Sequence, residues 1–460
     1  MKSDLRLSCI AALADTPLNG PDGPIPRRFV ADSRLVVPGD AFVAFRGEQV
    51  NGHEYIHDAV SRGATLIICE ENQGIPDHVA SIIVDNCFSA IPRMARRYLE
   101  IHRESLEVIA VTGSVGKTTT REMIRTCLAP SFKVHSAEHS YNTLIGCALS
   151  ILAMPADAEI LILEMGTNHP GEIGEMVDFF PPTISLITEV APAHLEGLGN
   201  VEGVAQAKFE ITRSPFLKTF FYFGDNPLLV SGAARLPSHV RSLSVGFGEN
   251  DFSIRDAEFI LANGLPSLSF EVVYKGETFH ASSSLFGRHS ALAAGFGIAL
   301  ALYLGASIER ALHSIQALQP PCGRGRFFLL PSGALLLDDS YNANPASMKA
   351  SLSESFHIPA NRRIAVLGEM RELGEDALNY HQELLPFFNM FSKVFIMGTL
   401  WRTLFRSSPL PENTVFFESP TSLGTEMKRE LGEGDLVVVK GSHGNRLDCL
   451  VDALVEEGIL

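Results

Sequence analysis

The pattern of apolar and polar residues divides the chain into three regions of short strands and helices. In the first region, up to about residue 85, short apolar segments predict strands at 41–45, 65–69 and 81–84. A helical pattern lies near 54–61. This region is therefore expected to form a small mixed α/β domain.

The second region alternates apolar segments with helical patterns. A helix is predicted from 88 to about 103, and strands follow at 108–111, 160–163 and 184–187. Strands that alternate with helices in this way form a parallel sheet covered on both faces. The central region is therefore expected to be a parallel-sheet domain.

Two further features belong to the second region. Residues 268–274 and 278–285 predict a hairpin that turns at Lys275-Gly276-Glu277. The most apolar run, 291–306, is short for a membrane span and rich in alanine and glycine, so it predicts a buried helix.

The third region begins near Pro320-Pro321 and repeats the alternation. It predicts a second, Rossmann-like doubly wound α/β domain. The expected domains are 1–85, 86–319 and 320–460. The strands predicted in the third region are 335–337, 364–367, 394–397, 415–417 and 436–439, with helices at 423–431 and 447–457.

Composition narrows the functional class. The net charge of −16 argues against binding to a nucleic-acid backbone, which needs a basic surface. The seven cysteines are scattered, which is typical of reduced thiols in a cytosol, and MKSDLRLSCI lacks the apolar core of a signal peptide. The sequence predicts a cytoplasmic protein without a membrane partner, and nothing in it requires more than a monomer.

The segment VTGSVGKTTT, Val111 to Thr120, predicts a phosphate-binding loop between a buried strand and a helix. Backbone N–H groups of such a loop surround phosphate oxygens, Lys117 reaches the β- and γ-phosphates of ATP, and Thr118 ligates Mg²⁺. The loop lacks the usual first glycine, because Val111 stands in its place; the alternative is an ordinary glycine-containing turn. The residues expected to bind ATP here are Gly113, Ser114, Val115, Gly116, Lys117, Thr118 and Thr119.

Two polar residues follow neighbouring strands of the same sheet. Glu164 comes directly after the strand at 160–163, and His194 lies in the loop after 184–187. The carboxyl ends of parallel strands meet at one edge, where ligands bind. Glu164, His194 and Thr118 are therefore candidate metal ligands; the alternative is a helix-capping glutamate and a surface histidine.

Lys208 lies on the apolar stripe of a predicted helix from Val201, four residues after Val204. Burial of a lysine lowers its pKa and yields a neutral amine, which can take up CO₂ and become an anionic carbamate. The alternative, which the residues alone favour, is a lysine whose stem covers the stripe while its charge reaches water.

Taken together, these segments resemble the Mur ligase family, closest to the members that add D-alanyl-D-alanine to UDP-N-acetylmuramoyl-tripeptide. The resemblance covers nearly the whole chain. The segments that carry it are ADSRLVVPGDAFVAFRG, NGHEYIHDA, VTGSVGKTTT, YNTLIG, LEMGTNHPGEI, ITEVAPAHLEGLGNVEGVAQAKFEI, GRGR, DDSYNANPASM, VLGEMRELG and KGSHGNRL.

The resemblance implies an ATP-dependent ligase with a UDP-sugar-binding, an ATP-binding and a C-terminal ligase domain. It implies an acyl-phosphate intermediate and two Mg²⁺ ions, one on Thr118 and Glu164 and one on His194 and carbamylated Lys208. Lys117, Lys208 and His194 are the implied catalytic residues. The remaining implied residues are Arg324, Asp339, Tyr341 and Asn342 at ATP, Asn142 in the cleft, and Ser33, Arg34, Asn51 and His53 at the UDP-sugar.

Departures from the family pattern and two alternatives remain. Asparagines of the family are replaced by Ser290 and Ala293, and an arginine by His443. For the base that deprotonates the incoming amine, Glu172 and His381 are the candidates. The alternatives are an ATP-dependent ligase for another acceptor, such as glutamate, and a nucleotide-gated binding protein without catalysis.

Overall fold

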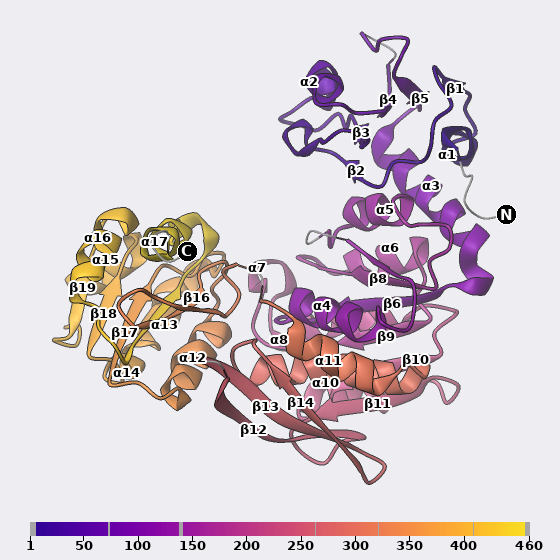
Figure 1. Ribbon diagram of the computed structural model, residues 1–460. Helices are drawn as coiled ribbons and strands as arrows, with labels where there is room; N and C mark the ends of the chain where they lie inside the picture. The colour runs from indigo at the N-terminus through magenta and orange to yellow at the C-terminus, as the bar shows by residue number, and fades with distance from the viewer. Residues whose placement is uncertain are drawn as a thin grey trace.

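A computed structural model describes residues 6–71, 74–137, 141–262, 264–320, 322–407 and 409–455. Three sheets of five, nine and six strands form an N-terminal, a central and a C-terminal domain. The N-terminal domain packs on one end of the central domain, and the C-terminal domain lies beside the central one (Figure 1). Pro321 and the last two residues of the predicted helix 447–457 lie outside the described residues.

The N-terminal sheet has the order β1-β5-β4-β3-β2, with β2 to β5 parallel and β1 antiparallel to β5. Alternate residues of β4 enter two different cores, Leu66 and Ile68 on one face and Ile67 and Cys69 on the other. Helices therefore cover both faces. The elements are α1 Leu7–Leu13, β1 Leu18–Asn19, β2 Phe29–Val30, β3 Ala41–Val43, α2 Ile56–Ser61, β4 Leu66–Cys69 and β5 Ala80–Ile83.

The central sheet has the order β14-β13-β12-β11-β10-β9-β6-β8-β7. Strands β6 to β12 pair in parallel with one another, and β12, β13 and β14 form an antiparallel meander. The strands are β6 Glu107–Thr112, β7 Val134–Ser136, β8 Ile160–Glu164, β9 Ile184–Ile187, β10 Thr219–Phe223, β11 Arg241–Gly246, β12 Phe252–Ala262, β13 Leu265–Tyr274 and β14 Glu277–Ser283.

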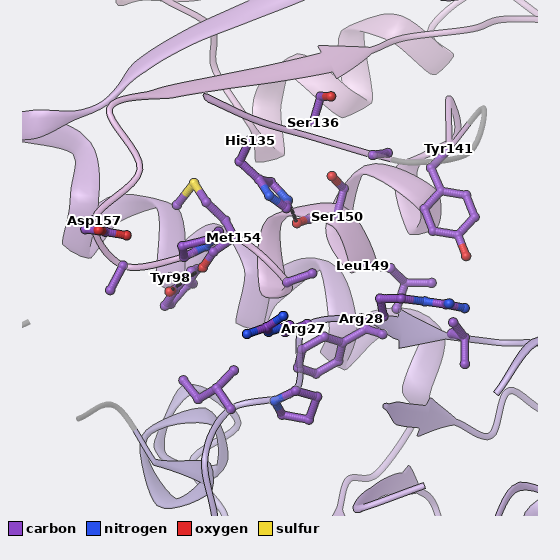
Figure 2. Close-up of a pocket in the computed structure, with 18 of the residues that line it drawn as sticks. Arg27, Arg28, Tyr98, His135, Ser136, Tyr141, Leu149, Ser150, Met154 and Asp157 are labelled. Carbon is purple, nitrogen blue, oxygen red and sulfur yellow. Dashed lines mark hydrogen bonds between the residues drawn. The ribbon is translucent and has the colours of Figure 1, made fainter. Parts of the chain in front are cut away.

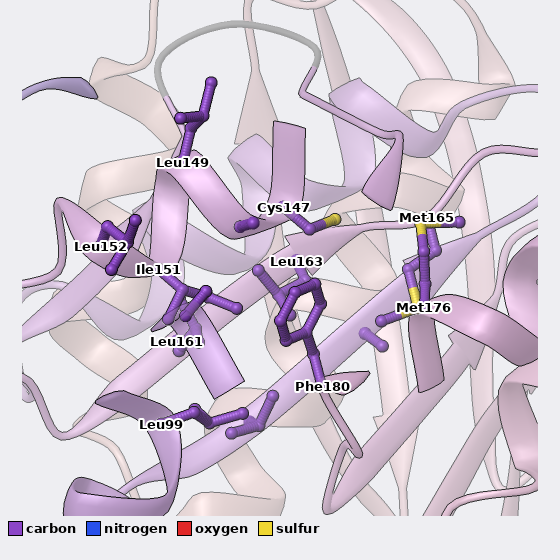
Figure 3. Packing of buried hydrophobic residues seen from close by; sticks show 14 of the residues in the cluster. Leu99, Cys147, Leu149, Ile151, Leu152, Leu161, Leu163, Met165, Met176 and Phe180 are labelled. Atoms are coloured by element: carbon purple, nitrogen blue, oxygen red, sulfur yellow. The ribbon is translucent and has the colours of Figure 1, made fainter. Parts of the chain in front are cut away.

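Helices cover both faces of the parallel part. Val108 and Ala110 of β6 enter one core, and Ile109 and Val111 enter the other. Figure 3 shows the first core, where Phe180 packs against side chains of α5 and β8. The helices are α3 Cys87–His102, α4 Lys117–Leu128, α5 Leu144–Leu152, α6 Glu172–Phe179, α7 Leu195–Leu198, α8 Val201–Phe209, α9 Pro227–Ala233, α10 Arg288–Leu304 and α11 Ile308–Ala317.

The C-terminal sheet has the order β15-β16-β20-β17-β18-β19, with only β15 antiparallel to its neighbour among the described strands. One core contains Trp401 and the other packs under α16 and α17. The elements are β15 Arg326–Leu329, β16 Leu335–Asp339, α12 Pro345–Glu354, β17 Arg362–Leu367, α13 Ala377–Gln382, α14 Leu385–Phe388, β18 Lys393–Ile396, α15 Thr399–Ser407, β19 Thr414–Phe416, α16 Pro420–Glu430, β20 Asp435–Lys440 and α17 Asp448–Val455.

The predicted three-domain α/β fold class is confirmed, as are the hairpin and the buried helix near 291–306. The predicted helix near 54–61 is two elements, a 3-10 helix Gly52–Tyr55 followed by α2. None of the described helices combines the length and apolar character that a bilayer span needs.

Candidate active site

The phosphate-binding loop joins β6 to α4 at the carboxyl edge of the central sheet. Gly113 has a φ of 156°, and a Cβ built on it would lie 1.9 Å from Thr188 Oγ1. Gly116 has a φ of 82° directly before α4. The two glycines that this chain retains are therefore the ones that its backbone requires, although Val111 replaces the first glycine of the usual pattern.

Hydrogen bonds tie this loop to the segment after β9. Ser114 N donates to Glu189 O at 2.8 Å, and Ser114 Oγ donates to Ala191 O at 2.8 Å. Thr188 Oγ1 donates to Val115 O. The same segment continues to His194, so the loop and the histidine are held by one framework.

Lys117 is the first residue of α4 and is half-buried. Its Nζ donates to Gly113 O at 2.8 Å, so the side chain folds over its own loop. Burial lowers the pKa of Lys117, Arg324 of the C-terminal domain lowers it further, and Glu164 opposes both. The amine is therefore placed among the groups that would surround a nucleotide phosphate.

Glu164 ends β8 and is buried, with 3% of its surface exposed. Its two oxygens lie 3.2 and 3.0 Å from Thr118 Oγ1. Arg121, one turn after Lys117 on α4, places Nη1 3.4 Å from Glu164 Oε2, and both side chains are buried. The structure thus brings Thr118 and Glu164 together as predicted neighbours, and adds Arg121, which the sequence analysis missed.

Replacement of Arg121 by methionine is expected to destabilise the protein by about 3 kcal/mol, because it leaves Glu164 buried without its cation. Urea unfolding measures the loss. Arg125→Met is the matched control one turn further along α4, since Arg125 pairs with Glu122 and is less buried; it should cost less than about 1 kcal/mol. Adding Glu164→Gln to Arg121→Met should recover part of the loss, and an additive result would contradict the pairing.

His194 has a φ of 52° and precedes α7 as its N-cap residue. Burial lowers the pKa of His194, and the charges of Lys117 and Lys208 lower it further. Glu372 and Glu172 raise it. His194 therefore lies within electrostatic reach of both lysines, at the strand edge where the sequence analysis expected it.

Lys208 lies on the buried side of α8, with 1% of its surface exposed. Burial, and then the charge of Lys117, lowers its pKa to about 7. Among the described residues it has no carboxylate partner. This burial excludes the alternative in which the lysine extends along the stripe to water.

Replacement of Lys208 by methionine is expected to stabilise the protein most below pH 7. The unfolded lysine keeps its proton up to about pH 10.4, whereas the folded one loses it near pH 7, so wild-type stability rises between these values. The free energy of unfolding of Lys208→Met minus that of the wild type should therefore decrease by about 3 kcal/mol from pH 6 to pH 9. Urea unfolding in CO₂-depleted buffer measures it, with the exposed Lys218→Met as a control. A pH-independent difference would contradict the lowered pKa.

The side chains at this edge of the sheet offer ligands for one Mg²⁺ ion but not for a second. Glu164 and Thr118 offer the hard oxygen ligands that Mg²⁺ prefers. Within the described ranges, no cluster of three His, Cys, Asp or Glu side chains is present that could hold a metal. A second ion beside His194 would therefore need an anionic oxygen donor, which Lys208 offers only as a carbamate.

The remaining predicted nucleotide residues belong to the C-terminal domain, and the charge of one of them, Arg324, reaches Lys117. Arg324 lies 4.4 Å above the ring of Tyr341, whose other neighbour is the ring of His443 at 5.5 Å. Lys440 Nζ lies 2.7 Å from Asp339 Oδ2 and donates to Asn342 O at 3.1 Å. The four predicted nucleotide residues of this domain therefore lie together, and Lys440 is an organising residue that the sequence analysis did not assign.

The predicted sugar-nucleotide residues form a separate group in the N-terminal domain, away from the phosphate-binding loop (Figure 1). Ser33 is buried, and Arg34 is exposed and paired with Asp32 at 2.6 Å. Asn51 accepts from His53 N at 3.2 Å, and His53 Nε2 accepts from Glu70 N at 2.9 Å. Both residues therefore also shape the local turn.

Asn142 lies at the start of α5, near Glu164. Its backbone oxygen accepts from Gly166 N at 2.8 Å, and its side chain packs against Gly166 so closely that a Cβ there would meet Nδ2 at 2.9 Å.

Ser290 donates to Phe286 O at 2.7 Å and is buried, as is Ala293. These two substituted positions of α10 are therefore buried in the protein core.

Neither candidate base is suited to its role. His381 is buried, with Nε2 accepting from Met370 N at 3.0 Å and Nδ1 donating to Ala377 O at 2.7 Å, so both ring nitrogens serve the fold. Glu172 accepts from the backbone N–H groups of Asn168 and His169, and these bonds offset its burial and hold its pKa below the usual value.

A cavity of about 960 Å³ lies between the N-terminal and central domains. Arg27 and Arg28 border it from one side, and His135, Tyr141 and Ser150 from the other (Figure 2). No predicted site residue lines it. The phosphate-binding loop is therefore a different site from this cavity.

Three family models match consecutive parts of the chain: the Mur ligase family catalytic domain at residues 29–111, the Mur ligase middle domain at 111–301 and the Mur ligase glutamate ligase domain at 325–443. Two UDP-N-acetylmuramoyl-tripeptide–D-alanyl-D-alanine ligases are similar over most of their length. The one from Rickettsia prowazekii is 30% identical over 433 residues, which cover 92% of this chain and 93% of the relative. The one from Synechocystis sp. is 32% identical over 438 residues, with 93% and 91% covered.

Solved structures agree with these matches. The MurF ligase from Thermotoga maritima in complex with ADP has a TM-score of 0.78 and 27% identity, over 94% of this chain and 98% of that one. A MurF structure from Acinetobacter baumannii has a TM-score of 0.82 over 97% and 98%; at 23% identity it supports the fold alone.

Proposed function

The chain belongs to the Mur ligase family, and we propose that it joins D-alanyl-D-alanine to UDP-N-acetylmuramoyl-tripeptide at the expense of ATP. The observation that carries the proposal is the cluster of Lys117, Thr118, Glu164, His194 and Lys208 at one sheet edge, opposite Arg324. The protein is thus an ATP-dependent, amide-bond-forming ligase of peptidoglycan precursor synthesis.

The reaction has two steps. A carboxylate oxygen of the tripeptide attacks the γ-phosphorus of ATP, the bond to the bridging oxygen breaks, and ADP leaves. The amine of D-alanyl-D-alanine then attacks the acyl carbon; the amide bond forms as the C–O bond to phosphate breaks, and a proton leaves the nitrogen. Two anions must approach each other in the first step, so cationic groups are needed around the transferred phosphoryl group.

This chain supplies those groups from both domains. Backbone N–H groups of the phosphate-binding loop and Lys117 would hold the β- and γ-phosphates, because loop and helix N-terminus present donors and positive charge there. Arg324 would approach the phosphates from the C-terminal domain. Asp339, Tyr341 and Asn342 would contact the nucleoside part of ATP.

Thr118 and Glu164 would hold one Mg²⁺, and His194 with carbamylated Lys208 a second. Bound magnesium neutralises phosphate charge and orients the transferred group. The lowered pKa of Lys208 supports carbamylation, since only the neutral amine reacts with CO₂. In the free protein, Arg121 and Thr118 contact the Glu164 carboxylate and hold it at the edge of the sheet.

The N-terminal residues Ser33, Arg34, Asn51 and His53 would bind the UDP-sugar, and Asn142 would meet the substrate in the cleft. The peptide would then extend from the N-terminal domain toward the phosphate-binding loop. Closure of the three domains would assemble the site and exclude water from the acyl phosphate. We place the enzyme in the cytoplasm and expect it to act as a monomer.

The decisive assay offers UDP-muramoyl tripeptides ending in diaminopimelate or lysine, each with D-alanyl-D-alanine, glutamate or diaminopimelate as the acceptor. Phosphate release that requires both ATP and D-alanyl-D-alanine supports the proposal and identifies the tripeptide. Release with glutamate alone would point to a ligase for another acceptor. Nucleotide binding without release under any combination would indicate a binding protein.

A further inference from the structure

Glu372 lies in the loop that follows β17, on the side of the C-terminal domain that faces the central domain. The loop is held rigidly: Met370 N donates to His381 Nε2, Arg371 N donates to Ser442 Oγ at 3.2 Å, and Ser442 N donates to Glu369 O at 3.1 Å. Glu372 itself is exposed and has a φ of 62°. The framework therefore fixes the backbone and leaves the carboxylate available.

The loop touches the segment that carries His194. A Cβ built on Gly374 would lie 2.9 Å from Glu196 Oε1 of α7, and each of these residues is two positions from Glu372 or His194. The charge of Glu372 reaches His194 across this contact. The carboxylate therefore borders the strand edge at which Lys117 and Lys208 also meet.

Glu372 and His194 both have an unusual backbone conformation. Glu372 and His194 are two of only six non-glycine residues with positive φ in the described parts of the chain. Such a conformation costs roughly 1–2 kcal/mol and persists only where the surroundings enforce it. Glu372 and His194 each lie two residues from the contact between Gly374 and Glu196, so the packing of the two domains fixes the backbone near both positions.

Amide-bond formation, the second step of the proposed reaction, requires an anionic group that can bind the incoming amine. The incoming dipeptide arrives with a positively charged ammonium group, whereas Lys117, Arg324 and Arg121 make the phosphate side of the cleft cationic. Glu164 and Glu172 are already engaged by Thr118 and Arg121 or by backbone donors. Among the described residues, Glu372 has no hydrogen-bond or ion-pair partner.

We propose that the carboxylate of Glu372 binds the ammonium group of the incoming D-alanyl-D-alanine and so places its nitrogen beside the acyl phosphate. The inference rests on the proposed function and adds a substrate-contacting residue from the C-terminal domain. The nitrogen can attack only after the ammonium group has passed a proton to water, and it must then lie about 3–3.5 Å from the acyl carbon. A charged hydrogen bond from a rigid loop supplies both affinity and that placement.

The test compares two ligands that differ only at the group concerned. D-lactyl-D-alanine carries a hydroxyl where D-alanyl-D-alanine carries its ammonium. Calorimetry with a non-hydrolysable ATP analogue and UDP-muramoyl tripeptide gives Kd for each ligand. Wild-type protein should prefer the ammonium ligand by about 10–100-fold, the range of one charged hydrogen bond, and Glu372→Gln should bring the two affinities to within about threefold.

Kinetics provide a second readout. Glu372→Gln should raise KM for D-alanyl-D-alanine by about 10-fold or more and leave KM for ATP unchanged, and Glu372→Asp should restore part of the affinity. Glu375→Gln is the matched control, because Glu375 is exposed on the short 3-10 helix Gly374–Asp376 that directly follows the loop; it should behave as wild type.

Two results would overturn the inference. One is an unchanged ligand preference in Glu372→Gln. The other is an equal loss of affinity for both ligands, which would indicate a structural role for the residue. A wild-type protein without D-alanyl-D-alanine-dependent phosphate release would instead contradict the proposed function, so the two failures are distinguishable.

Discussion

Replacing Lys117 by alanine is expected to lower the rate of phosphate release by about 10³-fold or more while the protein remains folded. The ammonium group would act on charge that accumulates as the phosphoryl group moves, so its contribution is larger in the transition state than in the bound state. In the free protein, the Lys117 ammonium group donates to Gly113 O, and within the described parts of the chain it has no ion-pair partner. Its loss should therefore cost little stability.

Phosphate release with both substrates measures the effect, and thermal unfolding reports the fold. Lys218→Ala is the matched control, since Lys218 is an exposed lysine of the same domain, paired with Glu107 at 2.8 Å; it should leave the rate unchanged. Ligation retained by Lys117→Ala would exclude the phosphate-binding role of this loop.

The sequence allowed the fold class to be predicted because each strand of the parallel sheets is a short apolar run between polar turns. Strands β7, β10, β11 and β12 of the central sheet were not predicted. TFFYF in β10 has no alternation, and β12 extends over Phe252–Ala262 with a register shift between Arg255 and Glu258. Periodicity does not distinguish such segments from buried loops or helices.

Some residues of the candidate site could be predicted from the sequence, and others could not. Glu164 and His194 could be placed from the sequence, because they follow parallel strands and such ends share one edge. Arg121 carried a weaker signal, as it lies one helical turn from Lys117. Glu372 lies in VLGEMRELG, one of the segments that carry the family resemblance, but its relation to His194 could not be predicted, since it depends on how two domains pack.

Replacing Lys208 by alanine is expected to lower activity by at least about 100-fold, because it removes the proposed anionic metal ligand. Lys208 is fully buried beside Lys117 and has no carboxylate partner among the described residues. A charged lysine there would repel the metal and the phosphates nearby. A carbamate instead would give the site the negative oxygen that the surrounding side chains do not provide.

The alanine variant leaves a small space in which an added carboxylate can take the place of the carbamate. Formate or acetate at millimolar concentration should therefore restore part of the phosphate release in Lys208→Ala. Lys208→Met is the matched control, because its side chain fills that space and should block rescue by either anion. Removal of CO₂ and bicarbonate should slow the wild type and leave both variants as they are. Full activity of Lys208→Ala without any anion would contradict the carbamate, and equal rescue of both variants would show that the anion acts elsewhere.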